Sequence, residues 1–164
     1  MSEIYNASEI FEIGIDIEKN GRAFYLAAAQ ATDNPAVKKL CEELAVWEEQ
    51  HVKIFEELKA NLSIDAEMQP AYNPDEEYEL YLKAIAGSHI FLVNHDVSEL
   101  IKNNPTAYDL LSIALTFEKD SVVLYTAMLK MVPEALGKHD INKIIDEEII
   151  HVSIISKQID LIRG

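Results

Sequence analysis

Apolar residues recur at intervals of three and four along four long segments of the chain, which is the spacing of one face of an α-helix. Polar and charged residues fill the positions between them, so each segment predicts an amphipathic helix. The predicted helices cover residues 8–31, 35–61, 105–131 and 140–162. The sequence contains no regular alternation of apolar and polar residues and no glycine-rich phosphate loop, so we expect an all-α protein.

The ends of these helices are marked by capping residues and prolines. Ser8 is the expected N-cap of the first helix, and Asp140 is the expected N-cap of the last. Asn-Pro pairs at 34–35 and 104–105 place a proline at the start of the second and third helices, where its missing N–H costs nothing. Residues 133–137 contain a proline and a glycine and predict the turn before the last helix.

A long segment separates the second predicted helix from the third. Residues 62–73 predict a loop, the Asn-Pro pair at 73–74 starts a shorter helix that Gly87 can end, and 88–103 are compatible with another short helix. Short connections within each helix pair and a long crossover between the pairs differ from a simple up-and-down bundle. We expect a single domain, 1–164, made of helix pair 8–61, crossover 62–104 and helix pair 105–162.

Composition narrows the range of partners and compartments. The 164 residues include 14 basic and 29 acidic side chains, a net charge of −15, which argues against nucleic acid or an anionic membrane as partner. Cys41 is the only cysteine, so a four-cysteine iron site of the rubredoxin kind is excluded from this sequence. The first residues do not predict a signal peptide, and no stretch of about 18 apolar residues occurs. We therefore expect a cytoplasmic protein.

A set of glutamates and histidines occurs twice in the sequence, 100 residues apart. The two sets are Glu18, Glu48 and His51 in the first half and Glu118, Glu148 and His151 in the second. A glutamate and a histidine three apart on a helix project the same way, because three residues fall only about 60° short of a full turn. Two such pairs, with one glutamate from each of two further helices, make up the ligand set of a two-metal carboxylate site in a four-helix bundle.

Electrostatics support the same interpretation. Four carboxylates that face one apolar core repel each other and lose hydration, so protons or cations must neutralise them. Two divalent metals would do so, with each histidine completing one metal's protein ligands. Mixed oxygen and nitrogen ligation with open positions suits iron or manganese better than magnesium or calcium. We expect two iron ions, with manganese or a mixed iron–manganese pair as alternatives.

Other residues near the motif have weaker interpretations. Small residues lie one turn from each lone glutamate, and we expect them to leave space for metal and a small substrate; they are Gly14, Gly21, Ala114 and Ser121. Tyr25 and Tyr125 also repeat after 100 residues; core packing is the ordinary role of such aromatics, and a hydrogen-bonding or redox role beside the metals is the functional alternative. Cys41 is expected to be a buried packing residue.

Several polar residues have no clear place in the predicted site. Glu147 could pair with His151 at a spacing of four, but the equivalent residue in the first half is Trp47, so the duplication argues against a general role for such a pair. Three histidines lack ligand partners at helical spacing and are predicted to be structural or exposed: His89, His95 and His139.

These motifs resemble the ferritin-like superfamily, and most closely its rubrerythrin-like branch. The resemblance covers the four long helices, and it implies a ferritin-like four-helix bundle whose long crossover contains an extra short helix between helices 2 and 3. It implies that Glu18 and Glu118 are terminal metal ligands. It further implies that Glu48 and Glu148 bridge the two metals and that each histidine of the motif binds one metal. The centre would be a non-haem di-iron site that reacts with peroxide or dioxygen, a chemistry linked to oxidative stress.

The sequence departs from the rubrerythrin pattern at two points. Rubrerythrins carry an extra glutamate one turn after the third-helix ligand, where this sequence has Ser121. They usually carry a rubredoxin domain, which these residues do not contain, so electrons would come from a separate donor protein. Bacterioferritins share the six-ligand set alone, but only 13 residues follow His151, too few for the short fifth helix of storage cages.

Three hypotheses follow for function. The first is a di-iron oxidoreductase acting on hydrogen peroxide or dioxygen. The second is a ferroxidase, in which iron itself is the substrate. The third is a metal-stabilised helical module that binds a partner through residues 74–103, a segment that could also be a lid or a contact within an expected homodimer.

Overall fold

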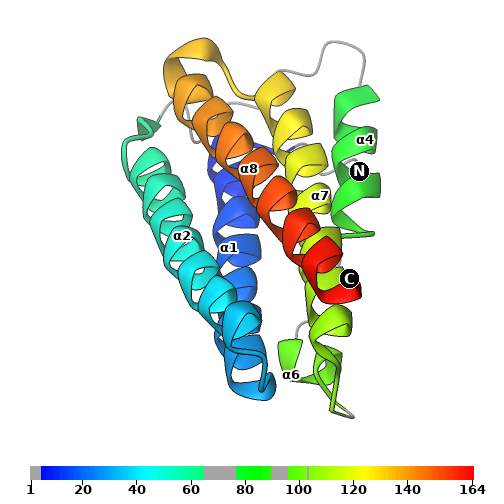
Figure 1. Ribbon diagram of the computed structural model, residues 1–164. Helices are drawn as coiled ribbons and strands as arrows, with labels where there is room; N and C mark the ends of the chain where they lie inside the picture. Colours follow the sequence, from blue (N-terminus) through cyan, green and yellow to red (C-terminus); the bar gives the residue numbers. More distant parts are fainter. Residues whose placement is uncertain (1–4, 65–76, 90–95, 103) are drawn as a thin grey trace.

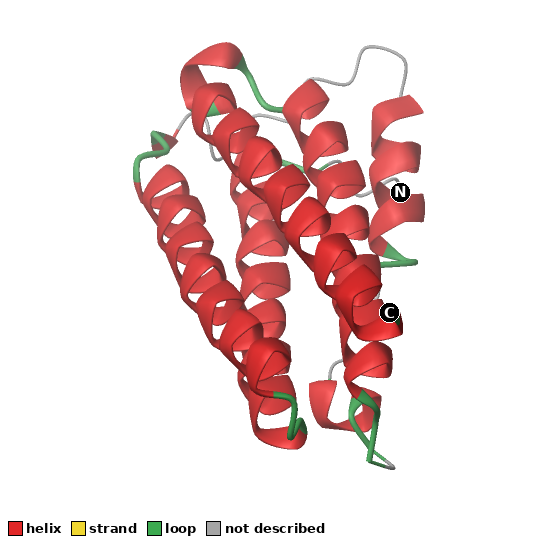
Figure 2. Ribbon diagram, viewed as in Figure 1, coloured by secondary structure: helices red, strands yellow, loops and turns green. Residues whose placement is uncertain are grey.

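The computed structural model describes residues 5–64, 77–89, 96–102 and 104–164, and the described part is all-α (Figures 1 and 2). Two antiparallel pairs of long helices form its body. The first pair is α1 (Ala7–Ala31) and α2 (Pro35–Ala60), and the second is α7 (Ala107–Met131) and α8 (Lys138–Arg163). The four long helices predicted from the sequence are therefore confirmed, with ends that differ by a few residues. No described helix is both long and apolar enough to cross a membrane.

The helix starts show where local prediction was inaccurate. The N-cap of α1 is Asn6 rather than Ser8, because Asn6 and Glu9 form a reciprocal capping box that satisfies two backbone N–H groups. A second capping box, Thr106 with Asp109, starts α7 just after the predicted Asn-Pro pair. Asn34 caps α2 with a proline at the first helical position, as predicted.

The last helix also begins earlier than predicted. Asp140 lies inside the first turn of α8, and the helix starts at Lys138, directly after Gly137. Gly137 has φ 107°, a left-handed conformation that a side chain would strain, and an added Cβ would collide with Leu58. The predicted turn is present as the short 3-10 helix η1 (Glu134–Leu136) followed by this glycine.

The crossover contains the predicted extra helix. It is α4 (Glu77–Ala86), which packs against α7, and it ends where Gly87 donates its N–H to the carbonyl of Lys83 (Figure 1). The start predicted at 73–74 lies outside the described residues. A second, four-residue helix, α6 (Val97–Leu100), falls within the segment for which another short helix was considered.

Each long helix buries one stripe of residues, and the stripes meet in a core that is apolar at both ends. The middle of the core is different, because four glutamates and two histidines are buried there, each at most 3% exposed. Buried charged side chains are rare unless they are paired or bind a metal. The bundle therefore positions a polar site at its centre.

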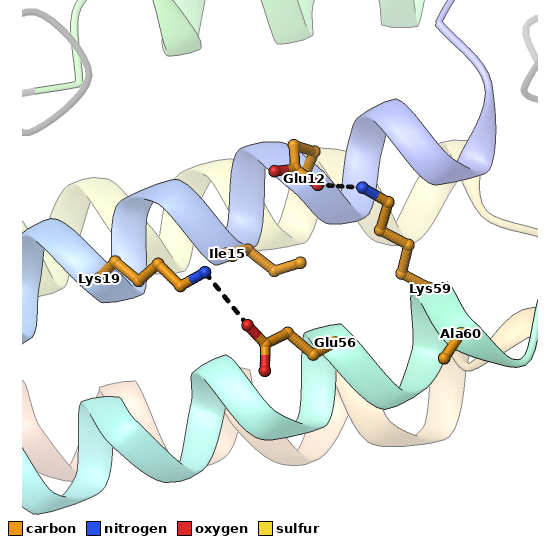
Figure 3. Close-up of a pocket in the computed structure, with 6 residues that line it drawn as sticks. All are labelled: Glu12, Ile15, Lys19, Glu56, Lys59 and Ala60. Atoms are coloured by element: carbon orange, nitrogen blue, oxygen red, sulfur yellow. Dashed lines mark hydrogen bonds and ion pairs between the residues drawn. The ribbon is translucent and has the colours of Figure 1, made fainter.

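A groove of about 390 Å³ between α1 and α2 lies on the outside of the bundle (Figure 3). Lys19 approaches Glu56 to 3.1 Å across it, and Lys59 pairs with Glu12. These four side chains are 38–56% exposed, so each pair stabilises the protein by about 0–1 kcal/mol. The groove holds solvated ion pairs and is distinct from the buried glutamates and histidines.

Candidate metal centre

The six predicted ligands converge from four helices. Glu18 comes from α1, Glu118 from α7, and the two Glu-x-x-His motifs from α2 and α8. Their ligand atoms form two groups, in each of which the atoms lie within 4.8 Å of one another. One group is Glu18, Glu48, His51 and Glu148; the other is Glu48, Glu118, Glu148 and His151. Glu48 and Glu148 belong to both groups, so they lie between two neighbouring positions for a cation.

Both histidines direct Nδ1 toward the carboxylates. Nδ1 of His51 lies 3.3 Å from Glu18 and 3.1 Å from Glu148. Nδ1 of His151 lies 2.8 Å from Glu148 and 3.5 Å from Glu118. The two imidazole centroids are 5.9 Å apart. His151 thus contacts the glutamate three residues before it on its own helix. His51 contacts glutamates of two other helices and shares a group with its own Glu48.

Many polar atoms of this cluster lack ordinary partners. Among the described residues, six buried atoms have no hydrogen-bond partner: Oε2 of Glu18, Oε1 and Oε2 of Glu48, Nδ1 of His51, Oε2 of Glu118 and Oε1 of Glu148. An unsatisfied buried polar group costs about 1–3 kcal/mol, and more when it is charged. Oxygen and nitrogen donors in this arrangement fit two divalent cations, which would satisfy them together.

Without metal, protons occupy part of the site. Burial raises the pKa of Glu48 well above its ordinary value, and the neighbouring Glu18 raises it further. Burial and Glu148 likewise raise the pKa of Glu118. Burial alone would lower the pKa of His51, but Glu18 and Glu148 outweigh it and raise that pKa to about 12.

The same balance acts on His151, where burial lowers the pKa and Glu118 and Glu148 raise it to about 9. Glu148 is the exception among the carboxyls: burial would raise its pKa, but the hydrogen bond from His151 and the close imidazole of His51 keep that pKa well below the ordinary value. Without metal, the ionised carboxylate of Glu148 thus lies between two protonated imidazoles. Two metal cations bound at the same place would stabilise that carboxylate in the same way.

The two tyrosines hydrogen-bond across the bundle. Tyr25 on α1 donates to Glu118 on α7, and Tyr125 on α7 donates to Glu18 on α1. Burial, reinforced by the carboxylate that each contacts, raises the pKa of both phenols, so both remain donors. Of the two roles considered for these residues, hydrogen bonding is present in the structure, and a redox role stays a prediction.

Glu147 contacts the site, but not through the histidine considered from the sequence. Its Oε2 lies 3.0 Å from Nε2 of His51, on the neighbouring helix. At the equivalent position of the other half, the edge of Trp47 packs on His151, with centroids 5.6 Å apart. Helical spacing within one helix cannot reveal a partner on another helix, so Glu147 was missed. The mismatch of glutamate and tryptophan at duplicated positions was the available signal.

His89 also lies near the site, although its sequence position gave no indication of this. Its side chain is fully buried against α7, where Nε2 is 3.4 Å from Oγ of Ser121 and the ring packs on Phe117. Its backbone N–H bonds to the carbonyl of Ile85, which anchors it to the end of α4. Burial lowers the pKa of His89 to about 4, with Glu148 acting in the opposite direction. Of the other histidines, His139 is exposed, as predicted, and His95 lies outside the described residues.

The glycines near Glu18 do not leave open space, in contrast to the expectation from sequence. A Cβ at Gly14 would be 2.9 Å from the ring of Phe55. A Cβ at Gly21 would be 2.5 Å from the ring of Phe117 and 3.2 Å from Glu48. Both glycines therefore allow aromatic rings to pack closely on α1. At Ser121, Oγ lies 3.4 Å from Nε2 of His89, so a longer side chain there would adjoin that imidazole. Cys41 is buried, as predicted, and burial raises the pKa of its thiol to about 12.

A sequence model of the rubrerythrin family matches residues 9–90, which is half of the 164 residues. The chain belongs to the rubrerythrin family. The match spans three ligands of this rubrerythrin-family chain: Glu18, Glu48 and His51. It ends before α7, so the ligand set of the second half rests on the internal duplication and on the geometry described above. No curated protein matches the chain.

The fold has a counterpart among solved structures. A crystal structure described as that of a ferritin-like diiron-carboxylate protein from Thermotoga maritima has a TM-score of 0.71, with 24% sequence identity and 95% of both chains covered. At this identity the likeness establishes the fold. The ferritin-like class predicted from helix order and the long crossover is thereby confirmed.

Proposed function

We propose that this rubrerythrin-family protein binds two iron ions in its central cluster and reduces hydrogen peroxide or dioxygen. The observation that carries the proposal is the pair of buried donor groups sharing Glu48 and Glu148. Shared carboxylates suit bridging ligands, while Glu18 and Glu118 occur in one group each and suit terminal ligands. Manganese, or one ion of each metal, would fit the same donors.

The chemistry balances for peroxide. Reduction of one hydrogen peroxide to two waters consumes two electrons and two protons, and two ferrous ions held by the six ligands would supply the two electrons. The chain's own residues shield the site, since all six ligands are buried, and the tyrosine hydrogen bonds fix one oxygen of each terminal glutamate. A separate electron-donor protein would return the site to the ferrous state.

The test is a stoichiometric one. Protein loaded with ferrous iron under anaerobic conditions should consume about one peroxide per iron pair, and a chemical reductant should restore it. Glu48→Gln and Glu148→Gln should lose most of both metals, because each removes a donor shared by the two positions. Glu49→Gln is the matched control, since Glu49 is adjacent to Glu48 but has a half-exposed side chain that pairs with Lys53 and Arg22.

The competing hypotheses give different results in the same experiment. A ferroxidase would take up and retain many irons per chain without sustained peroxide consumption. A metal-stabilised interaction module would bind two metals but show no turnover with any electron donor. Full metal content in both Gln variants would contradict the assignment of the site itself.

A further inference from the structure

The donors that face the metal positions are nearly equivalent in the two halves of the chain. Each position has one terminal glutamate, two shared glutamates and the Nδ1 atom of one histidine. Each terminal glutamate also accepts one tyrosine hydrogen bond from across the bundle. A site built only from these groups would bind two metals with similar affinity.

The two histidines differ in what surrounds them away from Nδ1, the nitrogen that faces the metal positions. Nε2 of His51 faces the carboxylate of Glu147 at 3.0 Å. In the part of the chain that the structure describes, the carboxylates within ion-pair distance of His151 are those of Glu118 and Glu148, and both contact Nδ1. The ring of His151 packs against the indole of Trp47, with centroids 5.6 Å apart, and an indole has no hydrogen-bond acceptor to offer an imidazole N–H.

Solvent access differs in the same direction. His51 is fully buried, whereas His151 lines a small surface cavity of about 80 Å³ together with Trp47, Glu147, Ile150 and Ile154. The imidazole of His151 therefore borders a surface cavity that the imidazole of His51 does not line. A metal beside His151 should therefore exchange more readily, because that imidazole lacks a carboxylate like Glu147 among the described residues and borders a surface cavity.

We propose that Glu147 is a positioning residue that makes the two metal positions unequal, with a tight position beside His51 and an exchangeable position beside His151. This inference rests on the proposed two-metal site. A carboxylate that accepts the Nε2–H of His51 fixes the tautomer with the lone pair on Nδ1, where the metal would bind, and makes that nitrogen a stronger donor. Removing such a partner typically weakens metal binding by about 10–100-fold.

Trp47 provides a direct way to test the order of filling, because it is the only tryptophan in the chain and it contacts His151. Apo protein is titrated with Co²⁺, whose visible absorbance counts both bound ions, while tryptophan fluorescence reports on the His151 position. In the wild type, most of the fluorescence change should accompany the second equivalent. In Glu147→Gln, fluorescence should change from the first equivalent onward, because the preference for the His51 position is lost.

Affinities are measured separately with Mn²⁺, by the spin-resonance signal of the free ion. The wild type should show two binding steps separated by about 10–100-fold, and Glu147→Gln should bring them together. Trp47→Glu adds a carboxylate at the duplicated position and should tighten the weaker step, whereas Trp47→Gln, which adds no charge, should tighten it less. Circular dichroism of each variant checks that the bundle is intact.

The outcomes separate this inference from the proposed function. Two steps that merge in Glu147→Gln, together with a tighter weak step in Trp47→Glu, support the inference. Two equal or cooperative steps in the wild type, or separated steps that Glu147→Gln leaves unchanged, overturn it and leave the two-metal site standing. If the wild type binds neither Co²⁺ nor Mn²⁺, the proposed function fails as well.

Discussion

Metal binding to this site should release protons, and the number can be worked from the structure. The pKa of His51 is raised to about 12 and that of His151 to about 9, so both imidazoles carry an extra proton at pH 7. The raised pKa values of Glu48 and Glu118 allow each carboxyl to hold up to one more. A ligand atom must lose its proton before it can bind a metal. Loading two metals should therefore release two to four protons.

The assay is isothermal titration calorimetry of the apo protein with Mn²⁺ at pH 7, repeated in buffers of different ionisation enthalpy. The dependence of the observed heat on the buffer gives the number of protons released. The overall binding constant for both ions should also rise by about 100-fold to 10,000-fold for each pH unit near neutrality, tenfold for each proton displaced. Glu49→Gln, which changes a half-exposed carboxylate outside the cluster, should leave both results unaltered.

The reasoning fails if fewer than one proton is released while two metals bind. That result would mean that the apo site is not held together by protons shared among its carboxylates and imidazoles. Release of about two protons would assign them to the histidines alone. Release of nearly four would show that Glu48 and Glu118 are both protonated in the apo protein at neutral pH.

Three further predictions concern stability. The raised pKa of His151 stabilises the apo fold by about 3 kcal/mol below pH 6.5, and this contribution is lost as the pH rises to about 9. Urea unfolding should show the loss in apo protein but not in metal-loaded protein. The lowered pKa of His89 gives stability the opposite pH dependence: the fold loses about 3 kcal/mol as the pH falls from 6.5 to about 4. His89→Gln should flatten that dependence in thermal melts. Tyr25→Phe and Tyr125→Phe each leave a buried glutamate oxygen without its donor. Each should destabilise the metal-loaded protein by about 1–3 kcal/mol in calorimetric melts. Stability equal to that of the wild type would refute the role of these bonds.

The helices and the inner donor set could be predicted because their causes are local. A stripe of apolar residues requires only the helical period, and a glutamate three residues before a histidine needs only one turn of helix. The duplication then supplied the long-range information, since Glu18 and Glu118 had to meet partners in matching register. Helix ends were less certain. Asn6 lay two residues before the predicted cap, and its choice depends on a reciprocal bond with Glu9 that competes with other nearby caps.

The outer contacts of the site depend on how helices pack, and a single helix does not contain that information. Glu147 reaches His51 on a neighbouring helix, and His89 reaches Ser121 from the end of α4, so neither contact has a characteristic spacing. The duplication nevertheless contained a clue. Where the inner donors repeat and an adjacent position does not, as with Trp47 and Glu147, the two halves must differ in what surrounds equivalent ligands. In a duplicated metal site, such a mismatch next to a ligand is the place to look for a functional difference between the two metals.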